Sequence, residues 1–129
     1  RGVVPRRIDQ RVTLMDVYPT VLELFGVSHA DVATSESLVS LLLGQDPVLT
    51  RPILGEGRLR RSLVHGDLNV IVDLRRKTAE AFDLAADPLE LDSFYDRDPT
   101  RAAPLLSALD RFFEQRGYHE GGYVPVYKP

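Results

Sequence analysis

The chain has 129 residues, of which 43% are hydrophobic and 27% are charged, and its formal net charge is −3. This length and composition are typical of one compact globular domain and exclude wholesale disorder. No apolar run approaches the roughly 20 residues of a membrane-spanning helix. With no cysteine in the chain, disulfides, thiolate metal ligands and a thiol nucleophile are excluded. The first residue is Arg1 and not methionine, which we interpret as a piece of a longer protein or a processed product.

The N-terminal part predicts an extended, basic lead-in followed by a helix over 16–25. Asp16 is a good N-cap residue, because its carboxylate can accept hydrogen bonds from the free amides of the first turn. Apolar residues then recur at helical spacing, namely Val17, Val21, Leu24 and Phe25. Gly26 is placed to end the helix in a left-handed conformation.

A second, shorter helix is predicted over 38–43. Ser35 is the expected cap of this helix, and Gly44 is expected to end it.

The middle of the chain predicts four short strands with tight turns between them, which favours an antiparallel meander. Gly66-Asp67 is a hairpin signal between the second and third strands. The predicted strands cover 53–57, 61–64, 69–74 and 80–84.

The C-terminal part predicts a helical turn within 89–95 and then a longer helix capped by Asp98. Leu105, Leu109, Phe112 and Phe113 form its apolar face, and Gly117 is expected to close it. Pro104 falls inside this pattern, where proline costs about 3 kcal/mol. We therefore expect either a kink at Pro104 or a helix that begins near it.

Together these elements predict an α+β fold in a single domain over residues 1–129. Residues 1–50 form a helical lead-in, residues 51–117 form a four-stranded antiparallel sheet packed with a C-terminal helix, and residues 118–129 form an extended tail.

The chain contains two small clusters of basic residues, the first formed by Arg58, Arg60 and Arg61 and the second by Arg75, Arg76 and Lys77. We interpret them as solvated charges at strand ends. A nucleic-acid surface would be more basic overall and would include stacking aromatic residues, so we expect no nucleic-acid partner.

Three stretches resemble the C-terminal region of sulfatases, which belong to the alkaline-phosphatase-like superfamily. Residues Ile8–Leu24 (IDQRVTLMDVYPTVLEL) are similar to the family's vdqpvslvDlyPTllel, and Ser37–Gly44 (SLVSLLLG) to its SLlpLLlG. Residues Glu80–Glu90 (EAFDLAADPLE) are similar to eLYDLaaDPgE, and Arg61–Ile71 occupies the place of R.vrtgdyKLI, with Asn69 where many members have lysine. The order and spacing fit over about residues 8–113.

The resemblance implies that the chemistry lies elsewhere in a full-length parent. Sulfatases use a formylglycine nucleophile, made from Cys or Ser in a Cys/Ser-x-Pro-x-Arg motif, and a calcium ion held by acidic residues and an asparagine. None of these motifs occurs in this chain, so we expect no catalytic residue, no metal site and no cofactor in it. The implied partners are the missing N-terminal catalytic domain and, in the parent, a small-molecule sulfate or phosphate ester. The sequence itself assigns no compartment, and the resemblance is compatible with a periplasmic or extracellular location.

Few residues are candidates for a site. His65 and Arg61 are the candidates for the rim of a substrate pocket, because hairpins of this subdomain can border the substrate cleft. Asp16 favours helix capping over metal binding, and Asp83, Asp87 and Glu90 match no calcium loop and favour turn stabilisation.

Two classes of function remain open at this stage. The chain is either the pocket-shaping C-terminal segment of a sulfatase or related phosphodiesterase or phosphonate hydrolase, or a free-standing non-catalytic binding module. If the helices of the segment are not covered by a catalytic domain, their apolar faces favour self-association.

Overall fold

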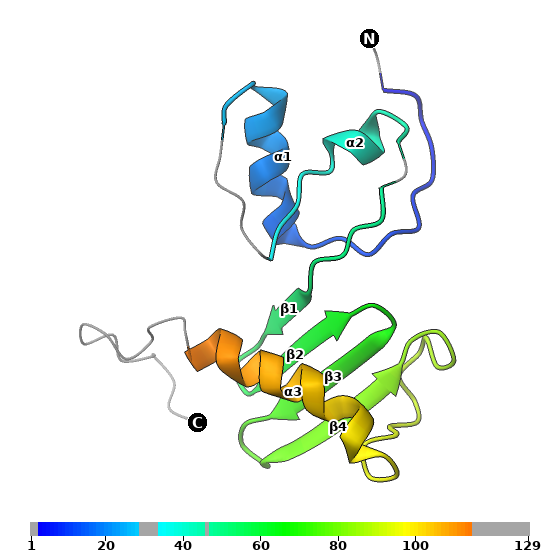
Figure 1. Cartoon of the computed structure of the whole chain (residues 1–129), viewed down its shortest axis with the longest axis vertical. Helices are drawn as coiled ribbons and strands as arrows, with labels where there is room; N and C mark the ends of the chain where they lie inside the picture. Colours follow the sequence, from blue (N-terminus) through cyan, green and yellow to red (C-terminus); the bar gives the residue numbers. More distant parts are fainter. Residues whose placement is uncertain (1–2, 29–33, 46, 115–129) are drawn as a thin grey trace, which may run out of the picture. The chain divides into compact units, whose positions relative to one another are not determined.

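The computed structural model describes residues 3–28, 34–45 and 47–114 (Figure 1). The chain divides into two compact units, Arg1–Ile53 and Leu54–Pro129. Each unit is described by itself, and the single-domain organisation stays a prediction. The tail over 118–129 and the predicted closure at Gly117 lie outside the described residues. Within the described residues, no helix combines the length and apolar character that a membrane crossing requires.

The first unit contains the 3-10 helix η1 (Leu14–Asp16), followed directly by α1 (Val17–Leu24). The predicted helix is therefore confirmed, and Gly26 ends it with a φ of +67°. Asp16 is the N-cap residue of α1, but its side chain makes no capping hydrogen bond to the amides of that helix, so the predicted capping role is wrong. Thr13 caps the first turn instead, and the Asp16 carboxylate accepts from the Thr13 amide at 2.8 Å in a reciprocal capping box.

The second helix of this unit, α2 (Val39–Leu42), is shorter than predicted. Its first turn is not capped by Ser35: the Ser37 hydroxyl accepts from the Val39 amide at 3.2 Å. Gly44, with a φ of +87°, ends it as expected. The Leu38 amide is also held from outside, because it donates to the Thr20 hydroxyl at 2.9 Å.

The second unit confirms the antiparallel meander, with strand order β1-β2-β3-β4 (Figure 1). Gly66 has a φ of +59° at the first central position of the β2–β3 turn, where a type II′ hairpin requires glycine. The register pairs Leu63 with Val70 and Val70 with Ala81. The strands are β1 (Ile53–Glu56), β2 (Arg60–His65), β3 (Leu68–Asp73) and β4 (Thr78–Asp83).

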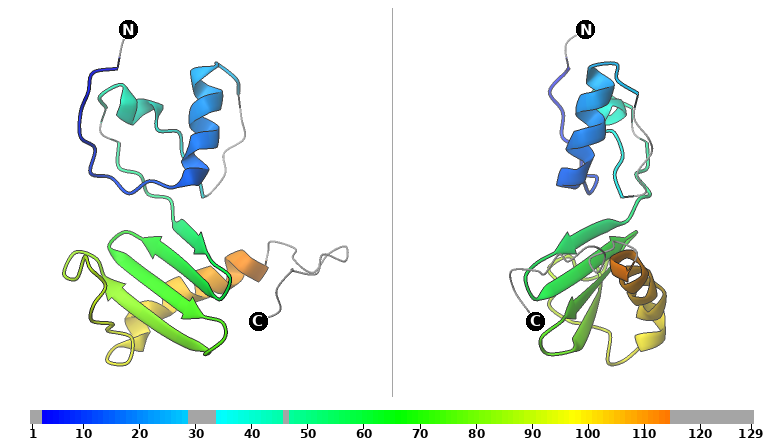
Figure 2. Two further views of the ribbon diagram at one scale, coloured as in Figure 1. Left: turned by 180° about the vertical axis from the view of Figure 1, so that it is seen from behind. Right: turned by 90° about the vertical axis from the view of Figure 1, so that its left-hand side faces the viewer.

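The helix α3 (Pro99–Glu114) lies across one face of this sheet (Figure 2). Its buried residues Ala102, Leu109 and Phe113 join the strand residues above in one hydrophobic core. The alternation of polar and apolar residues along the strands thus places a single apolar face toward the helix, as the sequence predicts. This core belongs entirely to the second unit.

The segment between β4 and α3 contains turns and no helix within 89–95, so the predicted helical turn is wrong. The reason is local. Asp87 accepts hydrogen bonds from the amides of Leu91 and Asp92 at 2.8 and 2.9 Å, and Glu90 has a left-handed φ of +56°, which interrupts a helical path. As predicted, Asp98 caps α3, accepting from the Arg101 amide at 3.2 Å.

The helix α3 begins at Pro99 and runs through Pro104, so a start near Pro104 is wrong. Pro104 is exposed, which lets water satisfy the carbonyl oxygen of Thr100 that has lost its helical amide donor.

Replacing Pro104 with alanine should therefore stabilise the second unit. Pro104→Ala restores the missing N–H, and we expect the free energy of unfolding to rise by about 1–2 kcal/mol, since the proline cost is partly offset in the unfolded chain. Urea denaturation measures this. Pro99→Ala is the matched control, because proline at the first helical position loses no hydrogen bond. An unchanged or lower stability for Pro104→Ala would contradict this account of the helix.

Candidate functional site

A buried ion pair joins Asp16 and Arg51 in the first unit. The two side chains are 0% and 3% exposed. The Arg51 Nε donates to Asp16 Oδ1 at 2.7 Å, and a second guanidinium nitrogen donates to Oδ2. This is the two-pronged geometry in which guanidinium and carboxylate bind most strongly.

Two backbone amides complete the environment of this carboxylate. Thr13 donates to Oδ2 at 2.8 Å, and Glu36 donates to Oδ1 at 3.0 Å. One helical turn on, the Thr20 hydroxyl donates to the Asp16 carbonyl oxygen at 2.5 Å. The pair therefore connects the start of α1 to two segments that lie 20 and 35 residues further along the chain. We call it the Asp16–Arg51 pair.

The charge on Asp16 is held by its partners. Burial raises the pKa of this carboxyl, but the hydrogen bonds from Arg51 and the two amides outweigh burial, so the pKa lies below its usual range. A fully buried and fully bonded carboxylate has no free oxygen face for a metal or a substrate. Its role in this structure is to hold the unit together.

Both predicted rim residues lie on β2. Because they are four positions apart in a strand, Arg61 and His65 project from the same face as Leu63, the face that α3 covers. His65 is exposed, next to the β2–β3 turn. The Arg61 guanidinium carbon lies 4.0 Å from the centre of the Phe113 ring, and its Nε is buried without a hydrogen-bond partner. Arg61 thus has a packing contact with α3.

The acidic turn stabilises itself, as the sequence predicts. Asp83 accepts from the amides of Ala85 and Ala86 at 3.1 and 3.3 Å, and its other oxygen pairs with Arg101. Asn69, at the position where the resembling family often has lysine, donates to Glu90 at 2.8 Å. The Asn69 Oδ1 is buried without a partner. Among the described residues, no group of three or more acidic or histidine side chains could hold a metal ion.

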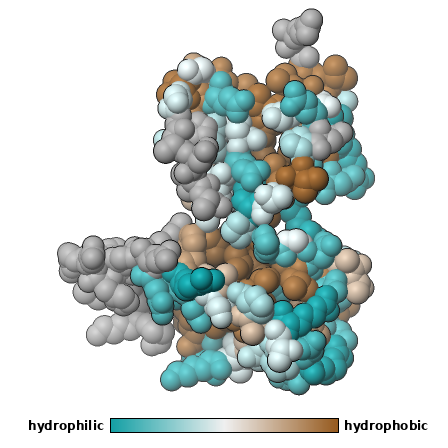
Figure 3. Space-filling view, in the orientation of Figure 1, coloured by the Kyte–Doolittle hydropathy of each residue, from teal (hydrophilic) through white to brown (hydrophobic). Residues whose placement is uncertain are grey.

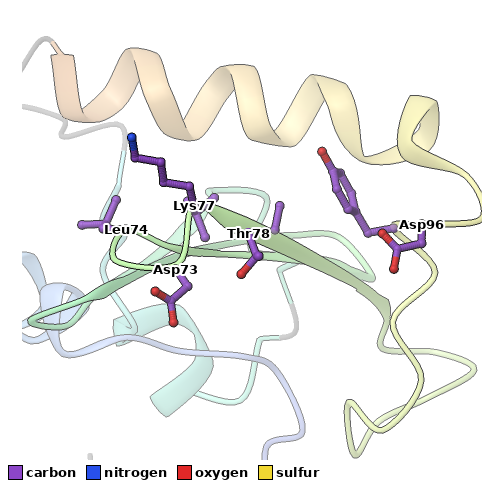
Figure 4. A pocket seen from close by; sticks show the side chains of 8 residues that line it. Asp73, Leu74, Lys77, Thr78 and Asp96 are labelled. Carbon is purple, nitrogen blue, oxygen red and sulfur yellow. The ribbon is translucent and has the colours of Figure 1, made fainter.

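Two hollows lie at the end of the sheet where β2 begins and β3 ends. One, about 510 Å³, lies between the β3–β4 turn and the segment at Tyr95 and Asp96. Figure 4 shows Lys77 in this hollow pointing toward α3, with Asp73 pointing to the opposite side. Its polar lining therefore mixes both signs of charge.

The other hollow, about 460 Å³, is lined by the β1–β2 turn and the β3–β4 turn. Four of its seven lining residues are arginines, Arg58, Arg60, Arg75 and Arg76, and its one acidic residue is Asp73. We call it the arginine groove. It combines residues from both basic clusters, which the sequence alone indicates only as separate strand-end charges.

Sequence reasoning also missed Arg51, the partner of Asp16. Nothing local marks it, since it lies in an irregular segment before β1 and its role depends on a contact 35 residues away.

Comparisons with solved structures show which fold this is. A candidate sulfatase from Bacteroides thetaiotaomicron VPI-5482 matches with a TM-score of 0.61 at 18% identity, over 78% of this chain and 24% of that one. A 2-O GAG sulfatase matches with a TM-score of 0.59 at 18% identity over the same shares. A protein solved in complex with its substrate D-glucosamine-2-N,6-O-disulfate matches with a TM-score of 0.60 at 17% identity, over 81% of this chain and 24% of that one.

The chain therefore has the fold of a segment of sulfatases, and it spans about a quarter of the length of those proteins. The resemblance to sulfatases and the α+β fold predicted from the sequence are both confirmed. No protein-family model and no curated protein sequence matches the chain.

Breaking the Asp16–Arg51 pair should strongly destabilise the first unit. Arg51→Met leaves a buried carboxylate without its counter-charge, and we expect a loss of about 3–5 kcal/mol in the free energy of unfolding at neutral pH. The exposed pair of Arg7 and Asp9 supplies the control, since Asp9→Asn should cost less than about 0.5 kcal/mol. Equal effects in urea denaturation would contradict the structural role of the pair.

The same pair predicts a pH dependence. Because the folded pKa of Asp16 lies below its unfolded value of about 3.9, the stabilisation is complete above that value and is lost as the pH falls through the folded pKa. Asp16→Asn should remove this part of the acid destabilisation below about pH 4. An acid profile of Asp16→Asn parallel to that of the unmodified chain would show that Asp16 is not held ionised by Arg51.

Proposed function

We propose that this chain is the C-terminal, non-catalytic part of a sulfatase-like hydrolase of sulfate esters, in which it stabilises the fold and shapes the substrate pocket. The observation that carries the proposal is the fold likeness to about a quarter of the length of solved sulfatases. The solved relative with its disulfated glucosamine substrate supports a sulfated sugar as the substrate class of the parent. The three resembling stretches around Asp16, Gly44 and Asp83 support the same assignment from the sequence.

The surface of the first unit has a feature that supports a binding partner for this unit. α1 and the turn before it expose a stripe of apolar side chains at helical spacing, with Leu14 89%, Tyr18 63%, Leu24 63% and Phe25 79% exposed. Figure 3 shows apolar residues reaching the surface of this unit in several places. A contiguous exposed apolar surface of this kind marks an interaction site. The apolar stripe consists of Leu14, Val17, Tyr18, Val21, Leu24 and Phe25.

The occupant that we assign to the apolar stripe is the catalytic domain of the parent. Most of the length of the solved sulfatases has no counterpart in this chain, and the side chains of the apolar stripe are between 43% and 89% exposed in this unit. Burying one leucine side chain contributes roughly 1.5–3 kcal/mol, so the stripe would stabilise the association of the two parts substantially.

His65 and Arg61 are the residues that we propose for the pocket rim. His65 is exposed at the β2–β3 turn, where its imidazole is free to face a ligand. Arg61 would act by its position: the contact with Phe113 fixes its guanidinium at the edge of α3.

The formylglycine and calcium of the resembling family do not fit the residues of this chain. The chain has no Cys/Ser-x-Pro-x-Arg motif, and residues 3–28, 34–45 and 47–114 contain no group of acidic or histidine side chains that could hold a metal ion. We therefore assign no step of hydrolysis to these residues. In the proposal, both groups belong to the part of the parent that precedes Arg1.

A two-piece reconstitution tests the proposed function. The parent truncated immediately before Arg1 should have no sulfatase activity alone and should gain it when co-expressed with this chain. Leu24→Asp places a charge in the apolar stripe and should lower the recovered activity by about tenfold or more, because an unpaired charge would be buried on association. Turnover of an aryl sulfate ester is the measurement.

Val48→Asp is the matched control, because Val48 is 81% exposed and lies outside α1, so the recovered activity should stay within about twofold. Circular dichroism checks that both variants fold. Failure of the unmodified chain to restore activity, or equal loss in both variants, would refute the proposed role. Turnover of phosphate esters alone would reassign the substrate class to a phosphodiesterase or phosphonate hydrolase.

A further inference from the structure

The arginine groove is formed by two turns that the sheet brings together. The Leu74 amide donates to the Leu59 carbonyl oxygen at 2.8 Å, which fastens the β3–β4 turn to the β1–β2 turn. The register of the sheet pairs Arg60, the first residue of β2, directly with Asp73, the last residue of β3. Backbone hydrogen bonding thus fixes the spacing between the two basic clusters.

Asp73 organises the groove without neutralising it. Its Oδ1 accepts from the backbone amides of Arg75 and Arg76 at 3.0 and 2.8 Å, and its Oδ2 lies 3.6 Å from the Arg60 Nε. The bonds that Asp73 makes to the β3–β4 turn use main-chain amides, so these bonds do not engage the guanidinium groups of Arg75 and Arg76. The side chains of Arg75 and Arg76 project from a turn whose backbone is held in place, and both residues are exposed.

We propose that the arginine groove binds the sulfate groups of a sulfated polysaccharide. Guanidinium is planar and presents paired donors that match two oxygens of a tetrahedral oxyanion. Arginine side chains from two turns, spread across a shallow hollow of about 460 Å³, suit several charges spaced along a chain better than one small ion. The choice of sulfate over phosphate rests on the proposed function.

The lining of the groove favours a glycan over a nucleic acid. None of its seven lining residues is aromatic, so the groove lacks the stacking platform on which single-stranded bases bind. The formal net charge of −3 over the whole chain also opposes general attraction to polyanions. Binding would therefore depend on this local cluster and not on the average charge of the protein.

Affinity of the full 129-residue chain for a fluorescent heparin oligosaccharide tests the proposal. Arg75→Ser/Arg76→Ser removes two exposed guanidinium groups and should weaken binding by about tenfold or more at fixed salt. Arg7→Ser/Arg111→Ser is the control with the same change in net charge, at exposed positions outside the groove, and should change the affinity by less than about twofold. Circular dichroism checks the fold of both variants.

Three further probes decide what the groove recognises. The desulfated oligosaccharide should not bind. Inorganic sulfate should displace the heparin oligosaccharide no better than sodium chloride does at the same ionic strength. Equal weakening by the two double variants, or inorganic sulfate binding as tightly as the oligosaccharide, would overturn the proposal. Tighter binding of an oligothymidine would also overturn it, in favour of nucleic acid.

The two proposals fail separately. If the chain does not bind heparin, the reconstitution of sulfatase activity can still succeed, because the arginine groove and the apolar stripe consist of different residues. Failed reconstitution with intact, groove-dependent heparin binding would leave a free-standing glycan-binding module.

Discussion

The first unit depends on one buried ion pair. Among the described residues of this unit, the two buried charged side chains are the Asp16 carboxylate and the Arg51 guanidinium. The pair ties the start of α1 to the segments at Glu36 and Arg51, while Val39 and Leu41 supply the buried apolar contacts of α2. A buried pair of this kind costs desolvation and stabilises only while both partners are present. The unit is therefore stabilised mainly by the hydrogen bonds of this ion pair, while its apolar stripe stays on the surface.

The second unit is stabilised differently, by an apolar core between one face of the sheet and α3. The features for which we propose ligand contacts, His65 and the arginine groove, lie at the ends of the strands. His65 lies at one end of β2 and the arginine groove at the other. A rigid sheet with charged turns is a suitable support for ligand contacts, since main-chain hydrogen bonds set the distances between them.

Sequence patterns that extend over only a few residues predicted the second unit well. Alternation over β3 and the glycine at the β2–β3 turn define the hairpin, and the apolar spacing defines α3. The same reasoning misjudged the role of Asp16. Aspartate does favour the start of a helix, but the partner of this carboxylate is Arg51, which lies 35 residues further along the chain. It also separated the two basic clusters, since only the pairing of Arg60 with Asp73 brings them together. The prediction for Pro104 failed for a further reason. The penalty of a proline inside a helix is reduced where the helix is exposed to water, and the exposure of Pro104 cannot be read from the sequence.

The central claim is that α1 presents an apolar surface that the catalytic domain of a sulfatase-like parent covers. Amide hydrogen exchange over Val21–Phe25, compared between this chain and the full-length parent at the same pH and temperature, tests it most directly. The account predicts slower exchange in the parent by about tenfold or more, because packing raises the free energy of local opening. It also predicts little change over the sheet pairing of β2 and β3. Equal exchange of Val21–Phe25 in the two proteins would contradict the claim.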